Sequence, residues 1–214
     1  MGTTKAHTKY KLSDGTVVPG VTTVLNQLGW NKNALMAWAR KTAMEGLDPN
    51  KVRDQAAEVG TIVHEMISAF LKKKELNLAI YSADDINKAR IAFDGFITWW
   101  NSAKLHYEFS EIKIVSDKYK FGGTLDLIAR NNGTRCLIDF KTSNGIYPEY
   151  KVQVAAYKKL ADQAEMPIDQ CYLLHISKEN GTITTMILND KVLRSGWKVF
   201  QHALALYNLQ KEME

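Results

Sequence analysis

The stretch CLIDFKTSNG, residues 136–145, has the pattern of a strand that carries opposite charges inside it. Because successive side chains of a strand point to opposite faces, Asp139 and Lys141 share one face with Leu137. The other face is apolar and holds Cys136, Ile138 and Phe140. Apolar residues on both faces favour a central strand, where charged groups are costly unless they are used. A D-x-K pattern on its own is also compatible with an exposed ion pair.

A second isolated carboxylate, Asp126, lies in the preceding predicted strand, GGTLDLIAR (122–130). The short connection NNG (131–133) predicts an antiparallel hairpin, and counting outward from this turn brings Asp126 close to Asp139. Two neighbouring carboxylates repel each other unless a cation lies between them, and oxygen ligands favour Mg²⁺ or Mn²⁺. Such a metal would lower the pKa of a bound water, while Lys141 would orient the water or stabilise developing charge. These are the parts that phosphodiester hydrolysis needs.

Helix and strand patterns surround these two strands. Apolar residues recur near the 3.6-residue period from about 53 to 74, and again after SADD (82–85), which resembles a capping box. A strand at 108–116 precedes the two carboxylate strands, and a helix from about Pro148 to Gln163 follows them. The remaining predicted elements are strands at 171–177 and 182–189 and a helix from about Val192 to Lys211. This order predicts an α/β fold in which helices pack on a mixed sheet.

The N-terminal part predicts a smaller, separate set of elements. YKLSDGTVVPG (10–20) predicts a hairpin that turns at Asp14 and Gly15, and a helix is expected at 31–46. DPN (48–50) is expected to break the chain. We expect a single domain over 1–214, since the sequence shows no repeat or linker. Its expected parts are an N-terminal hairpin and helical extension (1–52), a catalytic core (53–177) and a C-terminal strand and helix (178–214).

Four further residues are candidates for the site. His64 lies one helical turn after Gly60, whose missing side chain leaves room for a metal or a strand backbone, or marks close helix packing. A lone histidine on a helix is also common as a surface or core residue. Gln153 and Tyr157 lie on one face of a predicted helix, either beside the site or as a polar edge next to a buried tyrosine. Glu111 is either a further carboxylate of the site or an exposed residue.

Composition sets limits on the class of function. The chain has 214 residues, a net charge of +5 and a pI of about 9.0, which is compatible with a polyanionic partner. Its two cysteines are too few for the four ligands of an iron–sulfur cluster. The sequence contains no GxxxxGK[ST] loop, the motif that would indicate ATP binding. The sequence has no apolar run of membrane-spanning length and no apolar core of a signal peptide. We therefore expect an intracellular protein, in a bacterial or phage-infected cytoplasm.

An ordered series of motifs carries a family resemblance. The series comprises GTIVHE (60–65), Glu111, GGTLD (122–126), IDFKT (138–142) and QVAAY (153–157). In this order and at these spacings it resembles the RecB-like branch of the PD-(D/E)XK nuclease superfamily. VPGVTTVL (18–25), followed by a tryptophan-containing helix, is similar to the mitochondrial genome maintenance exonucleases and their phage relatives.

The resemblance implies a three-layer restriction-endonuclease-like fold with an αβββαβ core and a site for Mg²⁺ or Mn²⁺. The implied metal ligands are His64, Asp126, Asp139 and the backbone carbonyl of Phe140. Lys141 would be the catalytic lysine, and Gln153 and Tyr157 would lie beside the site and near DNA. Because the chain lacks a four-cysteine cluster and a helicase domain, it resembles a stand-alone nuclease or a subunit with a helicase or recombination partner.

We therefore expect a metal-dependent deoxyribonuclease that acts as an exonuclease on single-stranded DNA or DNA ends, in DNA repair or recombination. One alternative is a structure-specific endonuclease on duplex or flapped DNA, and another is a nuclease-fold protein that binds DNA without cutting it. Lysines such as Lys72, Lys73 and Lys74 would attract DNA, although lysines at the end of a helix also complement the helix dipole.

Overall fold

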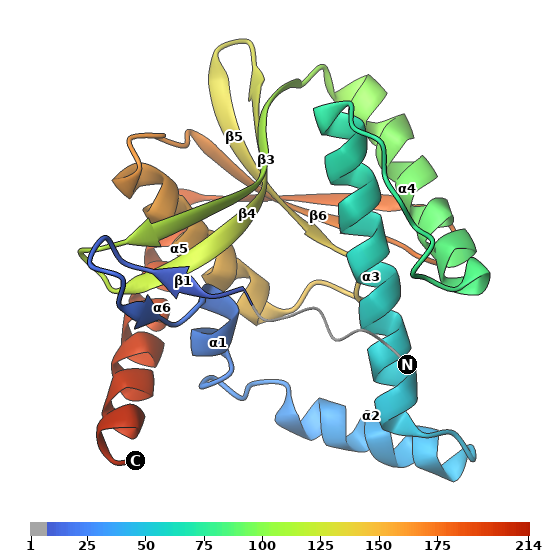
Figure 1. Ribbon diagram of the computed structural model, residues 1–214, viewed down its shortest axis with the longest axis horizontal. Coiled ribbons are helices and arrows are strands. Elements are labelled where there is room, and N and C mark those ends of the chain that lie inside the picture. Colours follow the sequence, from blue (N-terminus) through green and yellow to red (C-terminus); the bar gives the residue numbers. More distant parts are fainter. Residues whose placement is uncertain (1–7) are drawn as a thin grey trace.

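A five-stranded mixed sheet forms the centre of the protein (Figure 1). The computed structural model describes residues 8–214, and the strand order in the sheet is β3-β4-β5-β6-β7. The strands are β3 (His106–Ser116), β4 (Phe121–Asn131), β5 (Thr134–Lys141), β6 (Gln170–Ile176) and β7 (Ile183–Leu188). All neighbours pair antiparallel except β5 and β6, which run parallel. The middle place of β5 confirms the prediction of a central strand.

Helices cover both faces of this sheet. On one face lie α3 (Pro49–Lys72) and α4 (Ala83–Ala103), and on the other lie α5 (Pro148–Gln163) and α6 (Asp190–Glu212) (Figure 1). The segment from α4 to β6 has the order helix, three antiparallel strands, helix, parallel strand. The predicted three-layer α/β fold with an αβββαβ core is therefore confirmed.

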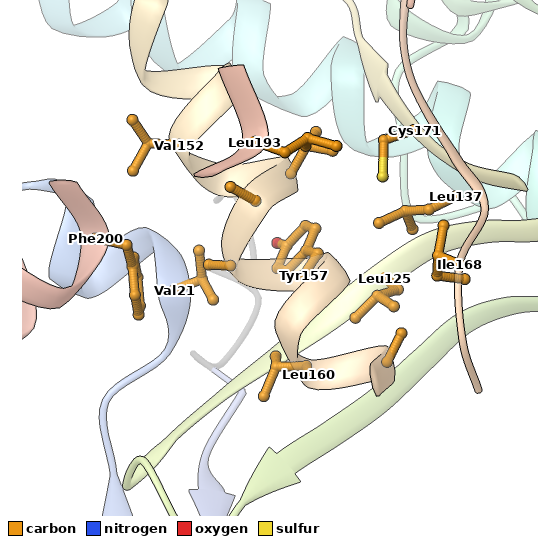
Figure 2. Close-up of a cluster of buried hydrophobic side chains, with 14 of the residues drawn as sticks. Val21, Leu125, Leu137, Val152, Tyr157, Leu160, Ile168, Cys171, Leu193 and Phe200 are labelled. Atoms are coloured by element: carbon orange, nitrogen blue, oxygen red, sulfur yellow. The ribbon is translucent and has the colours of Figure 1, made fainter. Parts of the chain in front are cut away.

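Each face of the sheet has its own apolar core, and β5 shows how strand alternation divides its side chains between them. Leu137 packs in the core under α5 and α6, together with Leu125 of β4 (Figure 2). Cys136, Ile138 and Phe140 pack in the core under α3 and α4. Burying one such leucine fully contributes about 1.5–3 kcal/mol, so a shift of the register by one residue would be strongly unfavourable. The predicted division of faces is confirmed, and it leaves the two charged residues of β5 on the α5 side.

The N-terminal segment docks on the start of β4. It contains β1 (Tyr10–Lys11), β2 (Val17–Val18), α1 (Val21–Leu25) and α2 (Lys32–Met44). β1 and β2 pair as the predicted hairpin, and Gly15 in its turn has a φ of +87°, which glycine adopts without steric cost. The ring of Tyr10 occupies the space that a side chain at Gly122 would need, because a Cβ there would lie 2.5 Å from the ring. Gly122 therefore allows the hairpin to pack against the sheet.

The start of α3 differs from the sequence prediction. The expectation that DPN (48–50) breaks the chain is wrong, because Asp48 is the N-cap of α3 and accepts hydrogen bonds from the backbone N–H groups of Asn50 and Lys51. Pro49 is the first residue of the helix, where its missing N–H would have no partner in the helix. α3 begins at Pro49 rather than near residue 53, and the expected boundary between 52 and 53 falls inside this helix.

The ends of the later helices follow the sequence signals more closely. The Ser82 side chain accepts a hydrogen bond from the backbone N–H of Asp85 and caps α4, as the capping-box pattern predicts. α5 has the predicted bounds, whereas α6 begins at Asp190, slightly before the predicted Val192. Within residues 8–214, no helix is long and apolar enough to cross a membrane.

Candidate active site

β4 changes face at Asp126. Leu125 packs under α5 and α6 while Leu127 packs under α3 and α4, although regular alternation would give both side chains the same face. On the neighbouring strand, Glu111 has a φ of 51°, in the left-handed region that non-glycine residues rarely adopt. The register pairs on either side place Glu111 opposite Asp126. Backbone strain of this kind is concentrated at functional sites, and here it lies where two carboxylates meet.

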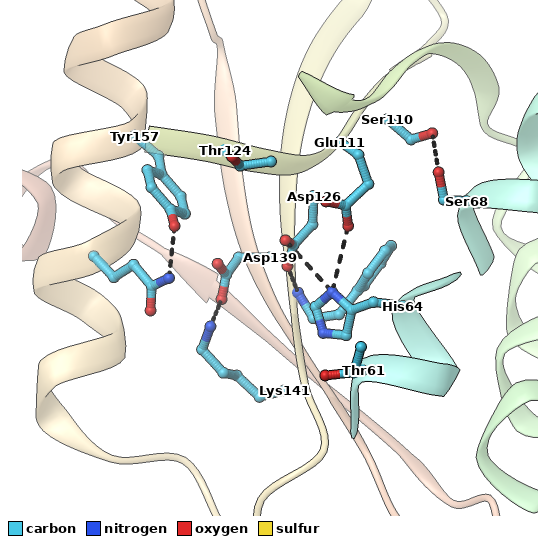
Figure 3. Close-up of polar contacts among 12 residues, drawn as sticks. Thr61, His64, Ser68, Ser110, Glu111, Thr124, Asp126, Asp139, Lys141 and Tyr157 are labelled. Atoms are coloured by element: carbon cyan, nitrogen blue, oxygen red, sulfur yellow. Dashed lines mark hydrogen bonds and ion pairs between the residues drawn. The ribbon is translucent and has the colours of Figure 1, made fainter. Parts of the chain in front are cut away.

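His64, Glu111 and Asp126 form one group of side chains, which we call the acidic cluster (Figure 3). Nδ1 of His64 lies 3.6 Å from Oε1 of Glu111 and 3.6 Å from Oδ1 of Asp126. One possible ligand atom from each residue lies within 4.8 Å of the others. The backbone N–H of Phe140 donates a hydrogen bond of 2.7 Å to Oδ2 of Asp126 and fixes this carboxylate from β5. α3, β3 and β4 thus bring three possible metal ligands together.

The charges of the acidic cluster shift the pKa of its members. Burial raises the pKa of Asp126 above its usual value, the imidazole of His64 opposes this rise, and the carboxylate of Asp139 adds to it. Burial lowers the pKa of His64, but the carboxylates of Asp126 and Glu111 more than offset this and raise the pKa overall. Two carboxylates, one buried (Asp126) and one more exposed (Glu111), therefore face one partly buried imidazole, and a bound cation would lower the electrostatic energy of the group.

Asp139 and Lys141 form the second part of the site, which we call the lysine pair. Oδ2 of Asp139 lies 2.5 Å from Nζ of Lys141, and the Asp139 side chain is 0% exposed. Among residues 8–214, neither oxygen of Asp139 accepts a hydrogen bond, so the contact is an ion pair without good hydrogen-bond direction. Burial lowers the pKa of Lys141, but the carboxylates of Asp139 and Asp126 more than offset this and favour the ammonium form. The ion pair that D-x-K suggested is present, but it is buried rather than exposed.

The donor set of the site fits a divalent cation. Carboxylate oxygens and an imidazole nitrogen converge in the acidic cluster, which includes Glu111, one of the residues whose role was open. The neighbouring Asp139 has buried oxygens that lack hydrogen bonds among the described residues, and buried acceptors normally have a donor or an ion. Phe140 contacts the cluster through its N–H. The metal-binding roles of Asp139 and of the Phe140 carbonyl stay predictions.

Tyr157 lies on the α5 side of the site (Figure 3), and Gln153 lies one turn earlier on the same helix. Nε2 of Gln153 donates a hydrogen bond of 2.8 Å to the Tyr157 hydroxyl, and both side chains are buried. Burial raises the pKa of Tyr157 well above its usual value, and the charges of Asp139 and Asp126 raise it further. Gly123 makes this packing possible, because a Cβ there would lie 2.7 Å from the Tyr157 ring. Gly123, which lies in β4 three residues before Asp126, therefore allows the close approach of α5.

Gly60 lies beside the strand end rather than beside a metal ligand. A Cβ at Gly60 would lie 2.8 Å from Oγ1 of Thr142, the residue that follows Lys141. The alternative of close packing between α3 and the β5 end is therefore the one that the structure shows. This contact sets how near α3, which carries His64, approaches the end of the strand that carries Lys141.

The sequence patterns do not predict three residues near the site. The Tyr10 hydroxyl lies 2.9 Å from Oγ1 of Thr124, a contact between segments far apart in the chain. The Tyr150 ring centroid lies 4.8 Å from Nζ of Lys141. Thr124 lies inside the GGTLD motif but no pattern gives it a role, and no motif singles out Tyr10. The signal for Tyr150 is its place one helical turn before Gln153, on the face of α5 that already holds candidate residues.

Comparison with known structures supports the fold. A protein described as "Putative exonuclease" from Eubacterium rectale is similar with a TM-score of 0.50 and 11% sequence identity, over 69% of this chain and 64% of that chain. LHK-Exo, solved in complex with dAMP, is similar with a TM-score of 0.37 and 12% identity, over 74% of this chain and 88% of that chain. The chain thus spans less than two thirds of the Eubacterium rectale protein.

Comparison of the sequence with protein families covers most of the chain. No curated protein matches the sequence. The family model of the PD-(D/E)XK nuclease superfamily matches residues 37–206, a segment that includes every residue of the acidic cluster and the lysine pair. This protein therefore belongs to the PD-(D/E)XK nuclease superfamily.

Proposed function

We propose that this protein is a metal-dependent deoxyribonuclease that hydrolyses phosphodiester bonds. The observation that best supports this proposal is the acidic cluster next to the buried lysine pair, in a chain of the nuclease superfamily. The two groups offer metal ligands and a fixed positive charge, and metal-assisted phosphodiester hydrolysis needs both. Mg²⁺ or Mn²⁺ is the proposed ion, because both accept carboxylate ligands readily.

The residues of the acidic cluster would hold the ion, with Asp139 and the Phe140 carbonyl as further ligands. When bound, the ion would lower the pKa of a water molecule and offset negative charge on the phosphate. The chain contributes the orientation of the ligands. Oδ2 of Asp126 accepts the N–H of Phe140, while Oδ1 lies 3.6 Å from Nδ1 of His64, so Oδ1 is the oxygen oriented towards the other proposed ligands.

Lys141 would act as a fixed positive charge rather than as a base, because its carboxylate neighbours favour the ammonium form. In the hydrolysis, the water oxygen forms a bond to phosphorus, the bond from phosphorus to the leaving sugar oxygen breaks, and that oxygen gains a proton. Negative charge grows on the phosphate oxygens during this step. A buried, positioned donor of this kind changes the rate by on the order of 10²–10³-fold.

The proposed substrate is single-stranded DNA or a DNA end, which the enzyme would degrade as an exonuclease. The net charge of +5 is compatible with DNA, the motif series resembles the RecB-like branch, and VPGVTTVL (18–25) is similar to the mitochondrial genome maintenance exonucleases and their phage relatives. A role in DNA repair or recombination, with a helicase or recombination protein as partner, is part of the same proposal. The alternatives are a structure-specific endonuclease and a DNA-binding protein without activity.

A panel of end-labelled oligonucleotides tests the proposal. Single-stranded, blunt, flapped and circular DNA would be incubated with Mg²⁺, Mn²⁺ or EDTA. We expect stepwise shortening of linear DNA with either metal and none with EDTA. Cutting of circles would replace the exonuclease by an endonuclease, and binding of DNA without cleavage in every condition would replace the enzyme by a binding protein.

Two variants and one control test whether the nuclease activity depends on the residues of this site. Lys141→Ala and Asp126→Ala should lose the metal-dependent degradation. Lys88→Ala is the matched control, because Lys88 is an exposed lysine of α4 whose ion pair with Asp84 lies outside the candidate site. Degradation at the unchanged rate by Lys141→Ala and Asp126→Ala would refute the assignment of the site.

A further inference from the structure

The ammonium group of Lys141 contacts both a carboxylate and an aromatic ring. Nζ lies 2.5 Å from Oδ2 of Asp139 and 4.8 Å from the ring centroid of Tyr150. A cation at this distance from the face of an aromatic ring is attracted by the ring electrons. Tyr150 stands on the first turn of α5 and is partly buried, so its ring forms a fixed wall on one side of the lysine.

A chain of directed hydrogen bonds holds the Tyr150 ring in this place. The hydroxyl of Ser143 donates to the carbonyl of Gly145 at 2.8 Å. Because a serine hydroxyl has one hydrogen, its oxygen can only accept from the Tyr150 hydroxyl, which lies 3.1 Å away. The direction of both bonds is therefore determined by the donor count. Tyr150 is fixed by α5 at its backbone and by the β5–α5 loop at its hydroxyl.

The loop itself is fixed from the neighbouring strand. Nε2 of His175 lies 2.5 Å from the carbonyl oxygen of Ser143, and since a carbonyl only accepts, the imidazole carries its hydrogen on Nε2. His175 is the register partner of Lys141 across the parallel β5–β6 pair. The residue of β6 that pairs with the lysine therefore anchors the loop, and the loop holds the ring against the lysine.

We propose that Tyr150 is a positioning residue for Lys141, and that the loop tied by Ser143 and His175 keeps its ring in place. The proposal rests on the proposed nuclease function of Lys141. A lysine has four flexible side-chain bonds, and ordering it costs free energy that a preformed contact reduces. Asp139 alone would draw the ammonium towards the buried strand. The ring limits this movement and keeps the charge at the surface that a phosphate reaches.

Kinetics of three variants test the proposal. Tyr150→Leu removes the ring, Tyr150→Phe keeps it, and Tyr107→Leu is the matched control, because Tyr107 is an exposed tyrosine near the start of the edge strand β3. A cation–π contact of ordinary strength predicts that Tyr150→Leu lowers kcat by about 2- to 30-fold with unchanged KM. Tyr150→Phe should keep most of the kcat, and in a Lys141→Ala background Tyr150→Leu should cause no further loss. Melting temperatures show that each variant is folded.

Several outcomes would overturn the proposal. An increase of KM without a change of kcat in Tyr150→Leu would mean that the ring contacts the substrate instead. Equal losses of kcat in Tyr150→Leu and Tyr150→Phe would show that the hydroxyl is responsible and not the ring. A further loss of kcat when Tyr150→Leu is added to Lys141→Ala would show that the ring supports the fold and not the lysine. Wild-type kcat in Tyr150→Leu would show that the ring has no role.

An NMR measurement separates this proposal from the proposed function. The face of an aromatic ring moves the signals of nearby protons, so the Hε signals of Lys141 should lie upfield in the unmutated protein. Tyr150→Leu should return them to the usual position, and Tyr150→Phe should not. Unchanged signals in Tyr150→Leu contradict the contact. A protein without nuclease activity but with these shifts would refute the proposed function while leaving the contact intact.

Discussion

The acidic cluster and the lysine pair are neighbours, yet they balance charge in opposite ways. In the acidic cluster, two carboxylates and one imidazole converge within 4.8 Å, and the pKa of both Asp126 and His64 is raised. In the lysine pair, the chain supplies a cation 2.5 Å from the buried carboxylate of Asp139. The acidic cluster has an excess of carboxylates that a cation from solution would balance. In the lysine pair, the ammonium group of Lys141 already balances one carboxylate charge.

The lysine pair is not explained by stability. Removing two charges from water costs about as much free energy as their attraction returns, so a buried ion pair is often neutral compared with apolar residues of the same size. The Asp139 oxygens also accept no hydrogen bonds among the described residues. A catalytic role of the positioned Lys141 charge would explain why the ion pair is buried, whereas packing does not explain it.

The largest expected effect is the loss of activity when either half of the site is broken. Asp126→Asn and Lys141→Met should each lower kcat by on the order of 10²–10³-fold, because each removes a group to which we assign a role in binding the metal or in offsetting charge in the transition state. Steady-state cleavage of a fluorescent oligonucleotide measures this loss. Because Lys141→Met leaves Asp139 buried without a counter-charge, Lys141→Arg serves as a folded reference that keeps the charge but alters its position. Activity in Asp126→Asn equal to that of Lys88→Ala would contradict the comparison.

The next largest effect is on thermal stability, and it separates the two halves. Mg²⁺ or Mn²⁺ should stabilise the unmutated protein, by about 2.7 kcal/mol at a metal concentration of 100 times the Kd. For a chain of this size this corresponds to an increase of about 5–10 °C in Tm. Differential scanning calorimetry with and without EDTA measures the shift.

The variants decide which half responds to metal. Asp126→Asn should lose most of the increase in Tm, since it removes a ligand of the acidic cluster. Lys141→Arg should retain the increase, because its guanidinium lies in the half that has its own cation. An equal loss of the metal response in both variants would show that metal binding depends on the position of the Lys141 charge as much as on the Asp126 carboxylate.

A smaller effect is expected at Glu111, where one substitution should raise the stability of the metal-free protein and lower its stabilisation by metal. Its φ of 51° is unfavourable for a non-glycine residue, so Glu111→Gly should raise the free energy of unfolding by about 1 kcal/mol in EDTA. The same change removes a carboxylate of the acidic cluster and should reduce the stabilisation by metal. Urea unfolding in EDTA and in Mn²⁺ gives both values. Glu111→Gln, which keeps the strained backbone but not the charge, should show only the loss of metal response.

Much of the fold and part of the site follow from local sequence patterns. The alternation in CLIDFK predicts the two faces of β5, since one residue of slip would exchange the buried faces. The short turn before β5 predicts that Asp126 and Asp139 are near each other, and the observed pairing of Leu127 with Ile138 confirms it. Both predictions need only the geometry of one hairpin.

The contacts that complete the site depend on information that no single segment holds. The left-handed φ of Glu111 and the change of face at Asp126 have no signal in the residue types, because glycine or asparagine would normally mark such a position. The contact of Tyr150 with Lys141 depends on how α5 packs on the sheet. For the same reason, the sequence does not predict that Thr142 is the residue next to Gly60, because a glycine alone does not identify the neighbour that packs against it.

The smallest expected effect lies at Gly60, where the two halves of the site meet. A Cβ in Gly60→Ala would lie 2.8 Å from Oγ1 of Thr142, so either the Thr142 side chain rotates or α3, which carries His64, moves away from the end of β5. Alanine also favours the helix by about 1 kcal/mol, which offsets part of this cost, so we expect a change in Tm close to zero and a loss of kcat of about threefold. Thr142→Ala removes the clashing oxygen, and the double variant should recover the kcat of Thr142→Ala alone. Additive losses in this cycle would mean that the spacing of α3 and β5 does not couple the acidic cluster to the lysine pair.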